Sequence, residues 1–202
     1  MFGQYSMGEA VKNGWALLMT KLFYPKARLV RRPIYVRGNK HFCYGSGLTT
    51  GYGCRFDLDS DGSTLVIGRN CKMNDRVHIV AHEQVEIGNN VLMASNIFIS
   101  DTSHGDYGSV PSDPSVPPDD RPLHTKPVRI GNNVWIGEGV CIMPGVIVGD
   151  GCVIGSNAVV TKSFPAGSIL AGIPARCIKH WNEDLRIWLT GESECDASGS
   201  SK

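Results

Sequence analysis

Apolar residues recur at every sixth position along the second half of the chain. Steps of six from Ile130 meet aliphatic residues only: Ile130, Ile136, Ile142, Val148, Ile154 and Val160. The positions four residues further on are also apolar: Val134, Val140, Val146, Cys152, Ala158 and Phe164. Glycine, asparagine and aspartate fill many positions between them, for example Gly131, Asn132 and Asn133. A period of six fits neither an amphipathic helix, at about 3.6, nor an alternating strand, at about 2.

This period predicts a triangular β-helix, in which three short strands form one coil of 18 residues. Each leading aliphatic residue points inward and stacks on the residue one coil later, as Ile130 does on Val148. Glycine and asparagine take the corners, where a positive φ is needed, and the coils stack at about 4.8 Å. The same phase appears earlier at Ile67, Met73, Ile79, Ile87, Met93 and Ile99, and more weakly at Phe42, Leu48 and Cys54.

Two spacings depart from one coil length. Ile67 and Ile87 are 20 residues apart, which indicates a corner two residues longer. Ile87 and Ile130 are 43 apart, which leaves 25 extra residues in the polar, proline-rich stretch 103–127. A long excursion from a regular solenoid is usually functional or disordered.

The N-terminal segment lies outside the repeat. Ser6-Met-Gly-Glu9 has the pattern of a capping box, and Pro25 is expected to end the segment. Apolar residues follow the box at helical spacing: Val11, Trp15, Leu18 and Leu22. We expect an amphipathic helix here. It either covers the open end of the solenoid, whose backbone is unpaired, or contacts the cytoplasmic membrane surface near a lipid-linked glycan. At the other end we expect a short helix at Asn182–Leu189 and a disordered tail at Gly191–Lys202.

Composition and charge narrow the class of protein. The 202 residues are 42% hydrophobic and 19% charged, which is typical of a globular chain, and no apolar run approaches the length of a membrane span or a signal peptide. Residues 1–40 carry eight lysines and arginines against Glu9 alone, whereas the remainder is net acidic. This basic arm suggests an anionic partner, such as a phosphate or a lipid headgroup. Seven cysteines without a C-x-x-C favour reduced thiols and a cytoplasmic protein over a disulfide framework or a zinc ribbon.

Several motifs resemble one enzyme family. They are Ile130-Gly-Asn-Asn-Val-Trp135-Ile-Gly, Met143-Pro-Gly145, Val160-Thr-Lys162 and Gly172-Ile-Pro-Ala-Arg176. The chain resembles the hexapeptide-repeat acyltransferases, which implies an all-β, left-handed parallel β-helix with an N-terminal helix, the extended loop and the C-terminal helix. We divide the chain into an N-terminal helix and basic arm (1–33), the β-helix acyltransferase domain (34–180), and a short helix with a tail (181–202).

The resemblance assigns catalytic roles to residues near the extended loop. His104, in Asp101-Thr-Ser-His104-Gly105, takes the place of the family's catalytic base, and a histidine suits proton removal from a sugar hydroxyl at neutral pH. Asn74, 30 residues earlier, matches an asparagine that holds the acceptor hydroxyl, although it is also a normal corner residue. Asp101 either orients the His104 ring or caps a turn. Arg121 either binds an acidic sugar or fixes the loop.

Acetyl-CoA is the donor that the resemblance implies. The matching positions are Trp135, Glu138, Ser156, Thr161, Lys162, Arg176 and Lys179. Trp135 would lie beside the acyl-transfer site and the coenzyme arm; the alternative role is packing between subunits, and the two roles are compatible. Arg176 and Lys179 would meet the phosphate end of the coenzyme. No phosphate-binding glycine motif occurs. A zinc site of His78, His82 and His104 has the wrong spacing for zinc β-helix enzymes, so we expect no metal.

Within the family, the pattern is most similar to bacterial O-acetyltransferases of lipopolysaccharide O-antigen and capsule synthesis. The stretches that carry this similarity are Met73-Asn74-Asp75-x-Val77-His78-Ile79, Ile99-Ser-Asp-x-x-His104-Gly105, Arg121-Pro-Leu and Pro127-Val-x-Ile-Gly. Galactoside and maltose acetyltransferases are similar over less of the pattern. We expect a homotrimer with a ternary-complex mechanism, a glycan acceptor and no nucleic-acid partner. The alternatives are an N-acyltransferase of an amino sugar or nucleotide sugar, and a non-catalytic β-helix scaffold.

Overall fold

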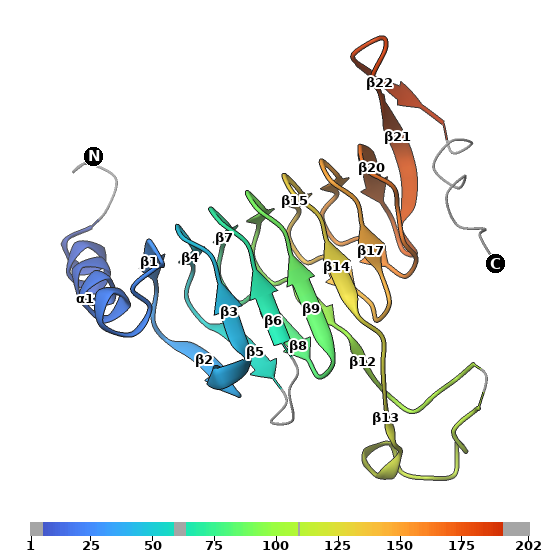
Figure 1. The fold of residues 1–202 in the computed structure, drawn as a ribbon, viewed down its shortest axis with the longest axis horizontal. Coiled ribbons are helices and arrows are strands. Elements are labelled where there is room, and N and C mark those ends of the chain that lie inside the picture. The colour runs from blue at the N-terminus through green and yellow to red at the C-terminus, as the bar shows by residue number, and fades with distance from the viewer. Residues whose placement is uncertain (1–5, 59–63, 109, 192–202) are drawn as a thin grey trace.

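The chain folds into a β-solenoid with three faces and one helix at its N-terminal end (Figure 1). The computed structural model describes residues 6–58, 64–108 and 110–191. Parallel strands stack along each face, and each coil crosses the three faces in turn. We name these faces A, B and C in the order in which the chain meets them, and the edges AB, BC and CA after the two faces that they join.

The strands of face A are β1 (Leu29–Val30), β4 (Thr49–Thr50), β7 (Lys72–Met73), β10 (Leu92–Met93), β15 (Trp135–Ile136), β18 (Val153–Ile154) and β20 (Ser168–Ala171). Those of face B are β2 (Ile34–Arg37), β5 (Cys54–Leu58), β8 (His78–Ala81), β11 (Phe98–Ser100), β16 (Cys141–Ile142) and β19 (Val159–Val160). Those of face C are β3 (Phe42–Tyr44), β6 (Thr64–Ile67), β9 (Gln84–Ile87), β14 (Val128–Ile130) and β17 (Ile147–Val148). A short 3-10 turn, η1 (Asn39–His41), precedes β3.

The strand register follows the spacing of the apolar residues. Ile130 pairs with Val148 one coil later, and Ile67 pairs with Ile87 across the longer coil. Ile87 pairs with Ile130 although 43 residues separate them, because the intervening excursion leaves the solenoid and returns to the same edge. The aliphatic residues of both predicted series are buried and fill the interior of the three-sided solenoid. The three residues of the weaker first coil are buried as well. The predicted hexapeptide-repeat β-solenoid is therefore confirmed.

Asparagines stabilise the corners, as predicted. Asn70, Asn90 and Asn133 all have φ between 56° and 58° and lie one above another on the CA edge. The amide of Asn70 donates to Asn90 at 3.3 Å, and that of Asn90 donates to Asn133 at 3.0 Å. An asparagine tolerates this left-handed backbone better than most residues, and its amide can both donate and accept along the stack.

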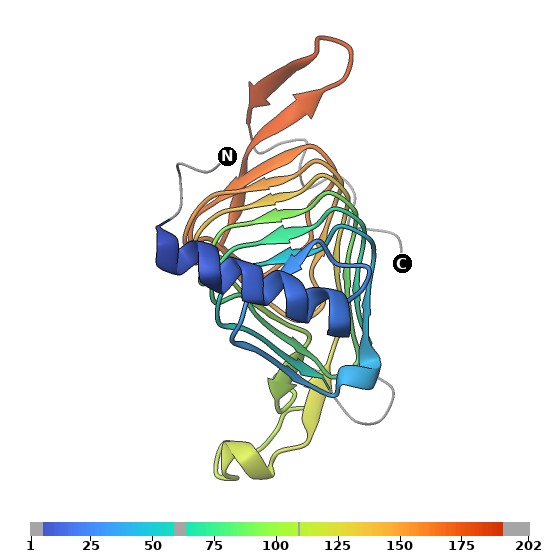
Figure 2. The same cartoon turned by 90° about the vertical axis from the view of Figure 1, so that its left-hand side faces the viewer.

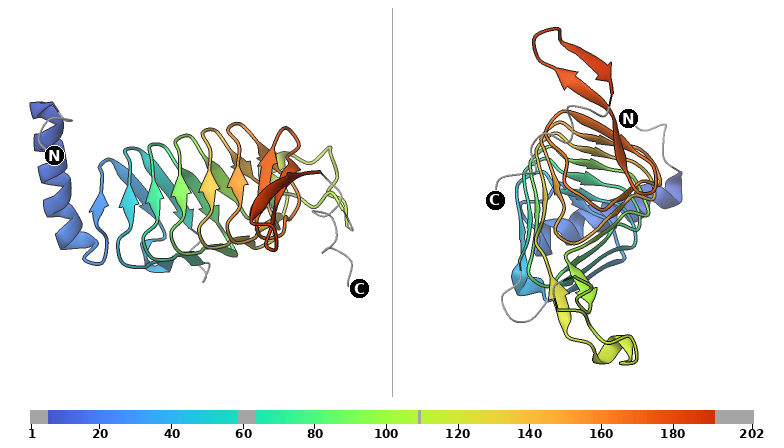
Figure 3. Two further views of the ribbon diagram at one scale, coloured as in Figure 1. Left: turned by 90° about the horizontal axis from the view of Figure 1, so that it is seen from above. Right: turned by 90° about the vertical axis from the view of Figure 1, so that its right-hand side faces the viewer.

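The predicted N-terminal helix is present as α1 (Met7–Phe23), and its capping box is complete. The helix lies across the open end of the solenoid (Figures 2 and 3). Ala16 and Thr20 are its buried residues, and the Thr20 hydroxyl accepts a 2.8 Å hydrogen bond from the Val30 backbone N–H on β1. The helix therefore covers the first coil, but it does so through its small residues. No helix of the described residues is long and apolar enough to cross a bilayer.

The predicted C-terminal helix at Asn182–Leu189 is wrong. After β20 the chain turns back as β21 (Arg176–Asn182) and then β22 (Ile187–Thr190), which form an antiparallel hairpin that extends beyond the solenoid (Figure 1). Trp181 and Trp188 face each other across it, with ring centroids 5.4 Å apart. The Asn182 side chain accepts a hydrogen bond from the backbone N–H of Leu185 and so closes the turn. The predicted tail lies outside the described residues except for Gly191.

The cysteines follow the expectation in part. Among the residues that the structure describes, five cysteines are free: Cys43, Cys54, Cys71, Cys141 and Cys152. Cys177 on β21 is disulfide-bonded, so the expectation of reduced thiols does not hold for it. Burial raises the pKa of the Cys54 thiol to about 11, and it also raises the pKa values of Cys71 and Cys152. These three thiols are therefore held protonated inside the solenoid, where they act as small apolar residues.

Candidate active site

The extended loop forms an arm that leaves the solenoid at the BC edge (Figure 1). Its two sides are strands β12 (Thr102–His104) and β13 (Leu123–Thr125), which pair antiparallel, and a 3-10 turn, η2 (Pro118–Asp120), lies near its tip. His104 is the last residue of β12 and lies opposite Leu123. Its side chain is exposed. The candidate base is therefore attached to a hydrogen-bonded ribbon with its ring accessible to a substrate.

Tyr107 and Arg121 brace the arm behind His104. The Tyr107 hydroxyl donates a 2.7 Å hydrogen bond to the backbone carbonyl oxygen of His104. The half-buried Arg121 guanidinium donates to that hydroxyl at 2.9 Å, and it also donates to the carbonyl oxygens of Val116 and Pro114. All three bonding nitrogens of Arg121 thus hold the loop, which agrees with the loop-fixing alternative. Sequence reasoning missed Tyr107, because no repeat spacing marks a residue inside an irregular loop.

Asp101 lies at the junction of the solenoid and the arm, and it is fully buried. One carboxylate oxygen accepts hydrogen bonds from the His82 backbone N–H and the Thr102 hydroxyl, and the other accepts from the backbone N–H groups of Glu83 and Gln84. Both carboxylate oxygens therefore accept hydrogen bonds from the corner before β9. These bonds agree with the turn-capping alternative for Asp101.

Asn74 lies on a different edge of the solenoid from His104. It follows β7 at the AB edge and is exposed, and its backbone N–H donates to the Met93 carbonyl oxygen one coil later. Strand β8 crosses face B between this edge and the BC edge, where the arm begins. At about 3.3 Å per residue, this crossing puts on the order of 20 Å between the two side chains within one chain. The fold of a single chain therefore keeps the two predicted acceptor-site residues apart.

The predicted coenzyme residues lie in four regions of the solenoid. Trp135 is 54% exposed on face A, beside Leu92, and Glu138 and Ser156 lie on the AB edge with Asn74. The AB edge is closely packed here, since a Cβ added to Gly137 would lie 2.7 Å from the Ser156 backbone nitrogen. Two further groups lie elsewhere: Thr161 and Lys162 on the BC edge, and Arg176 and Lys179 on β21.

Glu138 has a structural role that the sequence did not reveal. Its carboxylate accepts a 3.0 Å hydrogen bond from the Ser95 backbone N–H and a 2.6 Å hydrogen bond from the Asn96 amide on the preceding coil. The Asn96 side chain in turn accepts from Arg76, one coil earlier still, at 2.7 Å. The AB edge is therefore stabilised by a continuous ladder of polar side chains.

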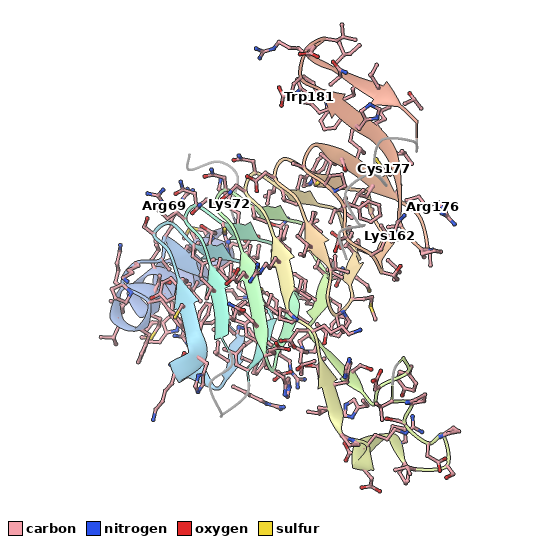
Figure 4. The ribbon with its side chains drawn as sticks, turned by 45° about the vertical axis from the view of Figure 1, so that its right-hand side comes forward. Arg69, Lys72, Lys162, Arg176, Cys177 and Trp181 are labelled. Carbon is pink, nitrogen blue, oxygen red and sulfur yellow. The ribbon has the colours of Figure 1, made fainter. Side chains whose placement is uncertain are left out.

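The C-terminal end of the solenoid carries exposed cations (Figure 4). Lys162, Arg176 and Lys179 are all exposed, and the Lys162 ammonium lies 5.5 Å from the centre of the Phe164 ring. Such cations are suited to the phosphate groups of a coenzyme. These three side chains are therefore suited to the coenzyme phosphates in charge, and they are accessible at this end of the molecule.

A second polar cluster lies on face B and was not predicted. The Asp57 carboxylate accepts a 2.6 Å bond from Arg55, contacts His78 Nε2 at 3.0 Å, and lies 3.5 Å from Arg37. Partial burial acts to raise the pKa of Asp57, but the hydrogen bonds from His78 and Arg55 and the positive charges outweigh it, so the pKa is lowered. Among the described residues, no group of three or more His, Cys, Asp or Glu side chains is arranged to hold a metal ion. The absence of metal stays a prediction.

The coils, the arm and its exposed histidine together make up a β-solenoid that carries a candidate general base. Residues 127–162 match the bacterial transferase hexapeptide family of six repeats. The chain is also 40% identical over 174 residues to WbbJ of Escherichia coli (strain K12), which is provisionally named a lipopolysaccharide biosynthesis O-acetyl transferase. This match covers 85% of the chain and 88% of WbbJ. The chain belongs to the hexapeptide-repeat acetyltransferases, and the resemblance drawn from the motifs is confirmed.

The chain is also similar to two other known proteins. The galactoside O-acetyltransferase of Escherichia coli (strain K12) is 40% identical over 124 residues, which cover 61% of this chain and 58% of that enzyme. A solved structure of AntD, an N-acyltransferase from Bacillus cereus, in complex with dTDP-4-amino-4,6-dideoxyglucose and coenzyme A, has a TM-score of 0.66. It covers 90% of this chain and 92% of AntD at 18% identity, and so supports the fold alone.

Proposed function

We propose that this protein transfers an acetyl group from acetyl-CoA to a hydroxyl of a sugar in lipopolysaccharide O-antigen or capsule synthesis. One observation carries the proposal: an exposed histidine on a braced arm, in a chain that is 40% identical over 85% of its length to an enzyme named for lipopolysaccharide O-acetylation. As in the resembled family, we infer that the β-helix is left-handed.

His104 acts as the general base of a ternary-complex reaction. Its imidazole takes the proton of the acceptor hydroxyl while the hydroxyl oxygen attacks the thioester carbonyl carbon. A backbone N–H stabilises the oxyanion of the tetrahedral intermediate. When this intermediate collapses, the carbon–sulfur bond breaks, and the coenzyme A thiolate recovers the proton from His104. The products are an acetyl ester and coenzyme A, and no covalent acetyl-enzyme is required.

The donor would lie along the AB edge and the C-terminal end. The resemblance implies that the backbone at Glu138 and Ser156 meets the pantetheine arm, and Gly137 lets the two coils stack closely there, since a Cβ on it would lie 2.7 Å from the Ser156 backbone nitrogen. Thr161 and Lys162 contribute further contacts, and Arg176 and Lys179 offer positive charge to the phosphates. Trp135 covers the region of acyl transfer from face A.

We further propose that the site is shared between copies of a homotrimer. Asn74 on the AB edge and His104 on the BC edge are separated by face B within one chain. In a threefold ring, one copy's BC edge faces another copy's AB edge, so both residues meet one acceptor. This arrangement gives Asn74 its expected task, which is to hold the acceptor hydroxyl near His104.

The first experiment separates donor binding from chemistry. Acetyl-CoA is titrated calorimetrically into the wild type, His104→Ala and the matched control His41→Ala, and transfer is measured on free, nucleotide-linked and lipid-linked sugars. We expect all three proteins to bind the donor, and His104→Ala to lose transfer by about 10²–10⁴-fold. Wild-type transfer by His104→Ala would exclude His104 as the base. Lack of donor binding by the wild type would favour the non-catalytic scaffold.

The same assay distinguishes the N-acyltransferase alternative. An acetyl ester is released by mild alkali, whereas an acetamide survives it. Transfer to an amino sugar with an alkali-stable product would replace the O-acetyl proposal and retain the donor and the base.

Complementation tests the shared site. His104→Ala and Asn74→Ala are co-expressed with different tags, and mixed oligomers are purified through both tags. If each site takes His104 from one copy and Asn74 from the next, about one in three sites of the doubly purified mixed trimers regains both residues. Activity no higher than that of either variant alone would show that each copy has a site of its own.

A further inference from the structure

Helix α1 presents its apolar stripe to solvent instead of to the solenoid. The stripe comprises five residues spaced four, four, three and four apart, which places them on one helical face: Met7, Val11, Trp15, Leu18 and Leu22. Their exposed fractions are between 57% and 86%. Large apolar side chains that are gathered on one face and exposed mark an interaction surface.

The stripe is not needed to attach the helix to the solenoid. The opposite face carries Ala16 and Thr20, which are buried, and Asn13, whose side chain accepts a 3.1 Å hydrogen bond from Arg31. Thr20 bonds to the backbone of β1. Small and polar contacts thus fasten α1 across the first coil (Figure 3). The apolar side chains of the stripe stay exposed to solvent.

Positive charge surrounds the stripe. Lys12 and Lys21 are exposed, and their positions in the helical turn put one on each side of the apolar face. Lys26 and Arg28 follow the helix and are also exposed. Glu9 is the one acidic residue in the first 40, and it is engaged with Ser6 in the capping box.

We propose that α1 docks this protein on an anionic lipid bilayer, with the stripe in the interfacial region and the flanking lysines against the phosphate headgroups. A helix with one apolar face between basic residues matches such a surface in both polarity and charge. A second copy is disfavoured as the occupant, because two basic ends would then meet. The arm with His104 leaves a side edge of the solenoid, so docking through the end leaves it accessible (Figure 1).

Vesicle sedimentation with the full-length chain tests the proposal. Vesicles of phosphatidylcholine alone are compared with vesicles containing about one third phosphatidylglycerol. We expect the wild type to pellet with the anionic vesicles alone, and to be released by salt, which screens exposed charges. Equal binding to neutral vesicles, or no binding to either, would overturn the proposal.

Paired variants assign the binding to the stripe. Trp15→Gln/Leu18→Gln should lower the vesicle partition coefficient by about tenfold or more. Leu185→Gln/Ile187→Gln, exposed apolar residues on the C-terminal hairpin, should keep the wild-type value. Lys12→Glu/Lys21→Glu should lose anionic binding, whereas Lys72→Glu/Lys126→Glu, with the same change in charge, should lose less. Circular dichroism confirms that each variant is folded.

Sedimentation velocity tests whether a second copy of the chain, instead of a bilayer, covers the stripe. The stripe variant should have the same mass in solution as the wild type. A lower mass for Trp15→Gln/Leu18→Gln would show instead that the stripe joins copies of the chain, and would overturn the proposal.

Discussion

The Tyr107 hydroxyl lies 2.7 Å from the backbone carbonyl oxygen of His104 and donates a hydrogen bond to it. The bond closes a turn between the candidate base and the rest of the arm. Arg121 holds the same hydroxyl from the other side, at 2.9 Å. Tyr107 therefore fixes the strand end from which the His104 side chain extends, and we expect it to act as a positioning residue.

Tyr107→Phe should reduce kcat for acetyl transfer by about three- to tenfold, because one hydrogen bond that orients the base is lost. KM for acetyl-CoA should stay near the wild-type value, since the proposed donor residues lie elsewhere. Steady-state kinetics on the wild type, Tyr107→Phe and Tyr35→Phe, which removes an exposed hydroxyl on β2, provide the comparison. A rise in KM at unchanged kcat would assign Tyr107 to substrate binding.

Asp101→Asn should destabilise the fold by about 2–4 kcal/mol. The buried carboxylate accepts four hydrogen bonds, three of them from backbone N–H groups at the corner 82–84. An asparagine amide would place a donor against some of these donors and leave them unsatisfied. Urea unfolding measures the loss, with Asp184→Asn in the exposed hairpin turn as the control. Wild-type stability combined with reduced transfer would instead support the His104-orienting alternative for Asp101.

Much of the fold could be predicted because each position of the six-residue repeat requires a particular type of residue, whatever lies elsewhere in the chain. Every sixth residue must be aliphatic to fill the three-sided solenoid, and glycine or asparagine must adopt the corners, so Ile130, Val148 and Asn133 mark the coils by themselves. The capping box of α1 is equally local. The face of α1 that meets the solenoid could not be predicted in this way, because it depends on the packing of Ala16 and Thr20 against the first coil.

The C-terminal hairpin escaped prediction because distant pairing outweighs local propensity. The segment from Asn182 contains helix-favouring residues, yet β21 completes hydrogen bonds on the free side of β20, and Trp181 packs on Trp188. Arg186 adopts a φ of 53° in the turn, a conformation that its sequence does not announce. Parts of the candidate site could not be predicted for a similar reason. Tyr107 bonds to His104 within an irregular loop, and the repeat does not show that Asn74 and His104 lie on separate edges.

The stability of the wild type should fall at acid pH partly through Asp57. The folded-state pKa of this carboxyl is lowered, so its contribution is complete above the ordinary value of 3.8 and is lost as the pH falls through the lower, folded value. Urea unfolding between about pH 6 and pH 2.5 should therefore show a shallower acid decline for Asp57→Asn than for the wild type. Asp184→Asn should follow the wild-type curve. Parallel curves for Asp57→Asn and the wild type would exclude this ion-pair cluster as a source of pH dependence.

A substitution of Glu138 should weaken the AB edge without weakening donor binding. Its carboxylate bonds to Ser95 and Asn96, whereas the proposed contact with the pantetheine arm is made by its backbone. Glu138→Ala should therefore lower the free energy of unfolding by about 1 kcal/mol, because the Ser95 N–H and the Asn96 amide each lose an acceptor. KM for acetyl-CoA should change less than about twofold, since a loss confined to ladder bonds removes no donor contact. Glu183→Ala, in the exposed turn of the hairpin, controls for the removal of a carboxylate. A large rise in KM at unchanged stability would place the Glu138 side chain itself in the donor site.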